Sequence, residues 1–298
     1  MHDFEYEAPT SLDEARELLA KHNGCIRLLA GGTDLIDQVR IGRLSPSIVM
    51  DVKRISELNL LDADANGLRI GAAVPCYRVS GHPVIAQKYS ALADSCRIIG
   101  GIQIQSRASI GGNICNSGPA ADSTPSVIAL GGVCVISGPR GTREVPAESF
   151  CTGPGKNVLG ADELLVEIRF PPPPDNTGSH YRRLIPRNEM DIAVVGVGAV
   201  VQLDSGGENF VSARIALGAV APTPLLATST AEALVGQPVD DETILKAANA
   251  ARDIVTPITD MRGTKEYRVH VTGVLARRVI GAAVGRARGE ELPYQCGH

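Results

Sequence analysis

The 298-residue sequence contains no tryptophan, and only 3% of its residues are aromatic. Proteins that stack the bases of single-stranded nucleic acid need such side chains, so their scarcity argues against that function. There is no surplus of positive charge either, because 29 Lys and Arg stand against 33 Asp and Glu, for a net charge of −4. Binding to the phosphate backbone of nucleic acid relies on a basic surface. We therefore expect no nucleic-acid partner.

The sequence also lacks a long uninterrupted apolar run. Its longest, Ile192 to Val201, contains Gly196 and Gly198 and is far shorter than the roughly 20 residues of a membrane-spanning helix. The first residues are acidic and lack the apolar segment of a secretory signal. We expect no membrane span and a cytoplasmic location.

Cysteine is present but is not arranged as a metal site or a disulfide framework. No two cysteines form a Cys-x-x-Cys pair, and their number is odd, at positions 25, 76, 96, 115, 134, 151 and 296. Scattered free thiols are typical of a protein in a reducing cytosol. We expect this chain alone to hold no metal, neither zinc nor an iron–sulfur cluster.

A proline run marks a boundary between two domains. Pro171–Pro174 cannot continue a helix or a strand ladder, and the next four residues, Asp175–Gly178, are turn formers. The sequence therefore predicts one domain over residues 1–176 and a second over residues 177–298.

Both domains are predicted to be α+β, because strand patterns occur together with helical patterns. In the first domain, Ser11 and Glu14 predict a capping box at the start of a helix. Further along it, the patterns predict strands at 25–30, 47–52, 68–72 and 133–137 and a helix at 84–97. The second domain is predicted to hold a three-stranded sheet at 180–185, 192–203 and 211–220, backed by helices at 230–235, 241–254 and 264–287. On the last helix, the arginines at 277, 278, 286 and 288 predict a solvated basic face.

Two loops with paired glycines are the strongest candidates for a binding site. The first lies within Leu28–Leu35 and the second within Ser109–Ile114. Paired glycines let the backbone approach a ligand and present several N–H groups in one direction, which suits a diphosphate. Thr33 and Asn113 add side-chain donors, whereas Asp34 would repel a phosphate and is expected to cap the following helix. Either loop taken alone is more often a simple tight turn than a binding site.

The usual nucleotide fingerprints are absent. Gly155-Lys156 has Phe150 where a P-loop requires glycine, and Gly196-x-Gly198 lacks the third glycine of a Rossmann motif. Asp122 leaves two interpretations open. It either accepts hydrogen bonds from a ribose or an adenine amino group, or it caps a helix predicted over residues 124–130.

Seven segments, taken together, are much more specific than either glycine loop: Ala30–Leu35, Ile110–Asn113, Pro119–Ser123, Phe150–Lys156, Met190–Ala193, Ala221–Pro224 and Lys265–Arg268. They span almost the whole chain, and in this order they make it resemble the FAD-binding medium subunit of the molybdenum hydroxylase family. That family includes xanthine dehydrogenase, nicotinate dehydrogenase and aerobic carbon monoxide dehydrogenase. Gly111–Asn116 and Thr152–Lys156 particularly suggest the flavin subunit of a three-subunit bacterial xanthine dehydrogenase. The resemblance implies a two-part FAD-binding domain of the vanillyl-alcohol-oxidase (PCMH) type, followed by a smaller α+β domain.

The resemblance also implies roles for individual residues. The two glycine loops would hold the FAD diphosphate, while Asp122, a leucine that matches Leu164, and the basic Arg183 would contact the cofactor. Ile99 stands where some relatives have an aromatic cover, and Arg183 replaces a lysine, which keeps the charge but not the geometry. The expected cofactor-binding residues are Leu28, Leu29, Ala30, Gly31, Gly32, Thr33, Asp34, Leu35, Ile99, Ser109, Ile110, Gly111, Gly112, Asn113, Asp122, Leu164 and Arg183. No residue of this chain is expected to be catalytic.

The implied function is electron transfer with non-covalent FAD. A large partner subunit would carry the molybdenum cofactor, and a small partner would carry two [2Fe–2S] clusters that pass electrons through FAD to NAD. A dimer of heterotrimers is expected, with xanthine as the favoured substrate and nicotinate, other N-heterocycles or carbon monoxide as alternatives. Two other classes stay open: a nucleotide-binding module without redox chemistry, and a flavoenzyme that attaches FAD covalently through His22, His82 or Cys115.

Overall fold

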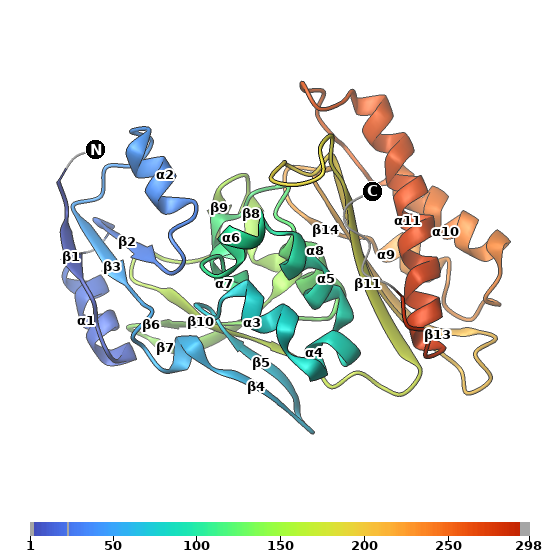
Figure 1. Ribbon diagram of the computed structural model, residues 1–298, viewed down its shortest axis with the longest axis horizontal. Helices are drawn as coiled ribbons and strands as arrows, with labels where there is room; N and C mark the ends of the chain where they lie inside the picture. Colours follow the sequence, from blue (N-terminus) through green and yellow to red (C-terminus); the bar gives the residue numbers. More distant parts are fainter. Residues whose placement is uncertain (1–2, 23, 293–298) are drawn as a thin grey trace.

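The computed structural model describes residues 3–22 and 24–292, which form three consecutive layered units (Figure 1). The first unit is a parallel sheet with the strand order β1-β3-β2 and two helices. Its elements are β1 (Glu5–Glu7), α1 (Leu12–Lys21), β2 (Ile26–Leu29), α2 (Leu35–Arg40) and β3 (Ile48–Asp51). The capping hydroxyl of Ser11 accepts from the Glu14 N–H at 3.2 Å, as the sequence predicts, while the Glu14 carboxylate reaches one residue further, to the Thr10 N–H.

The second unit is an antiparallel sheet with the order β4-β5-β10-β6-β7, interrupted by a long helical excursion between β5 and β6. Its strands are β4 (Leu61–Asp64), β5 (Gly67–Gly71), β6 (Val133–Gly138), β7 (Gly141–Pro146) and β10 (Leu164–Phe170). A small hairpin is formed by β8 (Cys151–Gly153) and β9 (Lys156–Asn157). The helices are α3 (Cys76–Gly81), α4 (Pro83–Lys88), α5 (Ser90–Ile98), α6 (Ile102–Gln105), α7 (Ile110–Asn116) and α8 (Ser123–Ala129), with short 3₁₀ turns at Glu57–Asn59 and Ala147–Ser149.

The helix predicted over residues 84–97 is broken in two at Tyr89. This residue is 3% exposed and has a non-helical backbone, with φ −125° and ψ 42°. Its hydroxyl donates to the Pro171 carbonyl at 3.1 Å, and its ring packs against Phe170. Tertiary packing at the domain boundary therefore overrides the local helical pattern.

The third unit is an antiparallel sheet with the order β11-β12-β13-β14, followed by two long helices. Its elements are β11 (Thr177–Leu184), β12 (Val195–Leu203), β13 (Phe210–Gly218), β14 (Leu225–Leu226), α9 (Thr228–Glu232), α10 (Asp241–Asp253) and α11 (Lys265–Ala287). The sequence predicts three strands, and the structure adds β14, whose two residues are too few to produce an alternating pattern. The expected α+β class of both domains is confirmed.

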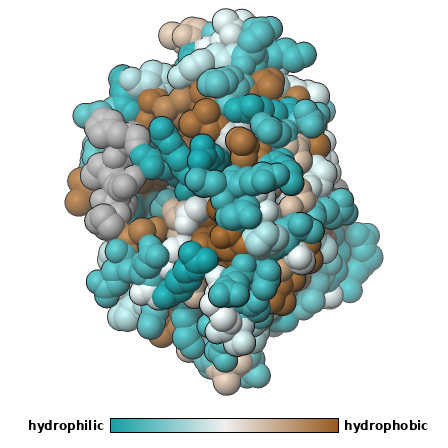
Figure 2. Space-filling view, turned by 90° about the vertical axis from the view of Figure 1, so that its right-hand side faces the viewer, coloured by the Kyte–Doolittle hydropathy of each residue, from teal (hydrophilic) through white to brown (hydrophobic). Residues whose placement is uncertain are grey.

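Helices cover both faces of this third sheet. Helix α11 packs on β11 and β12 from one side, with α10 behind it, while α5 and α8 of the preceding unit pack on the other side. Figure 2 shows the side of the molecule on which α10 and α11 lie, and its surface is mostly polar, with apolar residues in small groups. Among the described helices, none has the length and apolarity needed to cross a bilayer.

Candidate functional site at the two glycine loops

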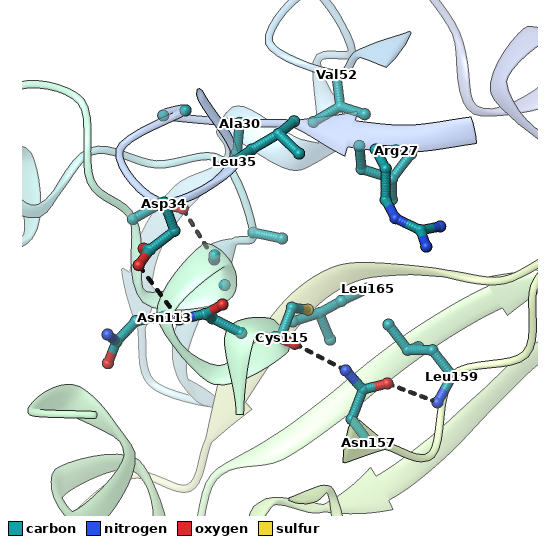
Figure 3. A pocket seen from close by; sticks show the side chains of 18 of the residues that line it. Arg27, Ala30, Asp34, Leu35, Val52, Asn113, Cys115, Asn157, Leu159 and Leu165 are labelled. Carbon is teal, nitrogen blue, oxygen red and sulfur yellow. Dashed lines mark hydrogen bonds between the residues drawn. The ribbon is translucent and has the colours of Figure 1, made fainter. Parts of the chain in front are cut away.

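The two glycine loops meet in the wall of one cavity of about 820 Å³. It lies between the first two units: the loop after β2 and the start of α7 form one side, and β10 and the segment before it form another (Figure 3). Cavities of this size hold nucleotide-sized molecules. The loops are far apart in the sequence, so the fold itself creates the site.

The first loop presents a row of unbonded amides to this cavity. Strand β2 ends at Leu29, and Gly32 turns the chain with φ +78°, a left-handed conformation that favours glycine. The N–H groups of Gly31, Gly32, Thr33 and Asp34 donate to no acceptor in the described part of the chain. A run of free amides of this kind forms an anion-binding concavity.

The second loop adds two more free amides. The Ser109 hydroxyl accepts from the Gly112 N–H at 3.0 Å and thereby starts α7. No described residue accepts from the N–H groups of Ile110 and Gly111. A diphosphate that lay between the two loops would satisfy amides from both.

Apolar side chains line another part of the cavity, namely Leu35, Val52, Leu159 and Leu165. The Asn157 side chain connects two segments of this wall: its Nδ2 donates to the Cys115 carbonyl at 2.8 Å, and its Oδ1 accepts from the Leu159 N–H at 3.0 Å (Figure 3). An extended ligand with a charged centre and apolar ends fits this pattern.

Two carboxyl groups in the wall have opposite environments. The Glu163 carboxylate accepts from both Nε and Nη2 of Arg143 and from the Gly160 N–H, and these bonds lower its pKa to about 2. Among the described residues no cation pairs with Asp34, and partial burial of its carboxyl group, with a smaller effect of Asp37, raises its pKa although the residue as a whole is exposed. Asp34 also makes no side-chain capping bond to α2, so the expected cap is wrong; its carboxylate instead accepts from Asn116 Nδ2 at 3.3 Å.

Most of the expected residues line the cavity, and a few do not. Those in its wall are Leu28, Ala30, Gly31, Gly32, Thr33, Asp34, Leu35, Ile99, Ser109, Gly111, Gly112 and Asn113. Leu29 and Ile110 belong to the loops but are not in the wall. On β10 the structure places Leu165 in the wall in place of the expected Leu164, because neighbouring strand residues face opposite sides.

Asp122 and Arg183 lie outside the wall and bind each other. Arg183 Nη1 donates to Asp122 Oδ2 at 2.5 Å, and the Tyr181 hydroxyl donates to Asp122 Oδ1 at 3.1 Å. Burial raises the Asp122 pKa to about 6 in spite of these bonds. Asp122 makes no capping bond to α8, so the capping interpretation is wrong. The second arginine nitrogen, Nη2, donates to the Ile98 carbonyl at 2.9 Å, directly before the cavity residue Ile99.

Two protein-family models match the sequence of nearly the whole chain. The model described as the FAD binding domain in molybdopterin dehydrogenase matches residues 2–173. The model described as the CO dehydrogenase flavoprotein C-terminal domain matches residues 180–283. The chain belongs to this family. It is an FAD-binding subunit of the molybdenum hydroxylase family, as the sequence motifs predict.

Relatives named as a xanthine dehydrogenase subunit and as a carbon monoxide dehydrogenase subunit are about equally similar to this FAD subunit. The chain is 34% identical to the putative xanthine dehydrogenase FAD-binding subunit of Escherichia coli K12, covering 97% of this chain and 99% of that one. It is 35% identical to the carbon monoxide dehydrogenase medium chain of Hydrogenophaga pseudoflava, covering 95% and 98%. A solved carbon monoxide dehydrogenase structure from that organism superposes with a TM-score of 0.91 at 34% identity, covering 96% of this chain and 98% of that one.

Sequence reasoning missed part of the FAD subunit's cavity. Arg27, Asn116, Asn157 and Glu163 all line it, but none belongs to a glycine loop. Two of them stand beside segments that the motifs singled out, because Asn116 ends Gly111–Asn116 and Asn157 follows Thr152–Lys156. Glu163 gave no signal, since only the fold brings it beside Arg143.

Proposed function

We propose that this FAD subunit passes electrons from iron–sulfur clusters of a partner through FAD to NAD. The observation that supports the proposal is that five residues with unbonded amides, from two loops distant in the sequence, line one nucleotide-sized cavity. This donor set fits a diphosphate, the part of FAD that any binding site must neutralise. Redox chemistry belongs to the cofactor, because FAD accepts electrons singly and releases them as a pair.

The residues of this chain would bind, orient and enclose the cofactor. The backbone N–H groups of Gly31–Asp34 and Gly111 would donate to the diphosphate, with the Thr33 hydroxyl and the Asn113 amide beside them. Leu165, in place of the expected Leu164, and Ile99 would supply apolar contacts. We propose an indirect role for Asp122 and Arg183, in which their pair holds the carbonyl of Ile98 and so positions Ile99.

Non-covalent binding is favoured over a covalent flavin link. Of the three candidate attachment residues, only Cys115 lines the cavity, and burial raises the pKa of its thiol to about 12. A protonated thiol is a poor nucleophile. His22 and His82 do not belong to the cavity wall. Denaturation is therefore expected to release FAD from the polypeptide.

We further propose a purine, xanthine in the first place, as the substrate of the complete enzyme. The motifs Gly111–Asn116 and Thr152–Lys156 support it, whereas overall identity separates xanthine from carbon monoxide relatives by only one percentage point, 34% against 35%. The molybdenum cofactor would lie on a large partner and two [2Fe–2S] clusters on a small one, in a dimer of heterotrimers in the cytoplasm. Nicotinate, other N-heterocycles and carbon monoxide are the alternatives.

Two measurements test these proposals. The purified chain is expected to carry, or to take up, one FAD with a flavin absorption band, and a chain that refuses added FAD would contradict the binding proposal. Affinity purification of the native complex is expected to yield molybdenum, iron and FAD in the ratio 1:4:1 with xanthine-dependent NAD reduction. A complex with that metal content but activity only on another substrate would overturn the choice of xanthine alone.

A further inference from the structure

We propose that Asp34 holds the FAD diphosphate as a neutral carboxylic acid, so that loading of the cavity takes up one proton. The inference rests on the proposed function, because it concerns the same site. It assigns to a carboxyl group the task of donating a hydrogen bond, which a carboxylate cannot do.

Asp34 is an acidic residue inside the loop that is proposed to bind an anion. It follows Gly32 and Thr33 directly, and its own N–H is one of the free amides of the first loop. Its side chain lines the same cavity (Figure 3). A short side chain at this point lies beside any anion that the loop binds, and in the structure it makes no capping bond that would hold it against α2.

The Asp34 carboxylate lacks a compensating cation among the described residues. Its side chain forms no ion pair there, and its one hydrogen bond comes from the neutral amide of Asn116. That amide is itself held by Gln38, whose Nε2 is 3.4 Å from Asn116 Oδ1. The side chain thus bridges α2 to the end of α7 through neutral groups only.

The charged groups on the surrounding elements do not offset the negative charge of the Asp34 carboxylate. Helix α2 contributes Asp37, whose negative charge disfavours a second carboxylate. Helix α7 contributes Cys115, a neutral thiol. On the cavity walls, Glu163 is bound to Arg143, and Arg27 donates to backbone carbonyls. Arg107, in the loop before α7, is exposed and forms no ion pair with Asp34.

A bound diphosphate would add negative charge beside Asp34. The Asp34 residue as a whole is exposed, yet partial burial of its carboxyl group, followed by the charge of Asp37, raises its pKa, and phosphate oxygens beside it would raise this pKa further. The protonated group then donates to a phosphate oxygen and the repulsion disappears. By linkage, FAD affinity falls as pH rises, by up to about tenfold per pH unit once Asp34 is ionised in the empty protein.

Calorimetry with the full chain tests the inference. FAD is titrated at pH 7 in buffers of different ionisation enthalpy, and the expected result is an uptake approaching one proton per FAD. Kd is measured in parallel by flavin fluorescence between pH 6 and 8.5, where wild-type affinity is expected to fall. Asp34→Asn keeps the shape and supplies a permanent neutral donor, so it is expected to bind at least as tightly at pH 8.5 and with no pH slope. Asp37→Asn is the matched control, and it should retain the slope.

The opposite result is equally distinct. If wild type binds FAD without proton uptake and Asp34→Asn weakens binding about tenfold, the carboxylate accepts from a ribose hydroxyl and the inference is wrong, while the proposed function stands. If neither protein binds FAD although both show the same thermal unfolding, the proposed function fails and this inference fails with it.

Discussion

At the scale of single residues, the four loop glycines are required for different reasons. A Cβ on Gly31 would lie 2.0 Å from the Arg107 carbonyl oxygen, and one on Gly111 would lie 2.4 Å from the Ala72 carbonyl oxygen. Gly32 is required by its left-handed backbone. Gly112 is the one of the four at which an added Cβ would meet neither backbone nor a left-handed conformation, since its single neighbour within 4 Å is the Ser109 hydroxyl at 3.1 Å. The sequence predicts that all four glycines make room for a ligand, whereas Gly31 and Gly111 make room for the backbone of neighbouring segments.

This difference predicts separable effects of two adjacent substitutions. Gly112→Ala places a methyl group among the amides, so FAD affinity is expected to fall about tenfold, or ~1.4 kcal/mol, with little change in the unfolding of the empty chain. Gly111→Ala forces backbone apart and is expected to cost ~2–4 kcal/mol of stability. Urea unfolding and flavin fluorescence measure the two effects. Gly281→Ala on α11, with no atom within 4 Å of the added Cβ, is the control. Unchanged FAD affinity in Gly112→Ala would contradict the placement of the diphosphate.

Glu163 predicts a pH dependence with a definite sign. Its folded-state pKa of about 2, held down mainly by Arg143, lies below its ordinary value of 4.5. The carboxylate therefore stabilises the fold above pH 4.5, and this stabilisation is lost as pH falls from about 5 towards 2. Glu163→Gln is expected to cost ~1–2 kcal/mol at pH 7, because Arg143 is partly exposed. The difference from wild type should narrow at pH 4, as measured by urea unfolding. Glu144→Gln, which breaks an exposed pair with Arg169, should cost below ~0.5 kcal/mol at both pH values.

At the scale of elements, the sequence predicts what is local and misses what is tertiary. The helix predicted over 241–254 is observed as α10 and that over 264–287 as α11, because both helical segments are long. The Gly196-x-Gly198 pattern has a packing explanation that no single strand could reveal: a Cβ on Gly198 would lie 2.9 Å from the Pro125 carbonyl oxygen of α8. Likewise, Gly178 of β11 admits the backbone of α11 on the opposite face.

One arginine of the expected basic face of α11 is instead an interdomain clamp. Arg286 donates twice to Asp94 of α5, at 2.6 and 3.0 Å, and once to the Ser179 carbonyl of β11. Burial alone would raise the Asp94 pKa, but the bonds from His180 and Arg286 hold it below its ordinary value. Sequence periodicity identifies the helix but cannot identify a partner 192 residues away.

Breaking this clamp is expected to be costly because its side chains are mostly buried. Arg286→Met leaves Asp94 without the partner that donates two hydrogen bonds to it, and we expect a loss of ~3 kcal/mol in the free energy of unfolding. The double variant Asp94→Leu with Arg286→Met should lose less than the sum of the two single variants, since it leaves no buried charge unpaired. Arg277→Met, which removes an exposed pair with Asp241, is the control and should cost below ~0.5 kcal/mol. Strict additivity in the double variant would contradict the clamp.

At the scale of the whole molecule, the predicted domains are not independent in their packing. Tyr181 and Ala216 belong to the C-terminal sheet, yet they pack within the hydrophobic core of the first domain. Helices α5 and α8 rest against that sheet, and the Ala219 N–H donates to the Pro119 carbonyl at 2.7 Å. The proline run at 171–174 predicts a domain boundary, whereas the elements on its two sides pack against each other over α5, α8, β11 and β13 (Figure 1). Composition and motifs predict the boundary but carry no information about this packing.

We therefore expect residues 1–176 to lose FAD binding when they are expressed alone, although every cavity residue lies within them. Without the C-terminal sheet, the fragment exposes the apolar faces of α5 and α8 and leaves Asp94 and Asp122 without their arginine partners, so it should aggregate or unfold at a lower temperature. The matched control is the full chain with a protease site inserted after Pro174, cut once after purification. The cut chain should elute as one particle and retain FAD, because the interface and not the covalent link joins the two parts. Size-exclusion chromatography with flavin absorbance measures both proteins, and a soluble fragment that binds FAD as tightly as the full chain would show that the cavity forms without its neighbour.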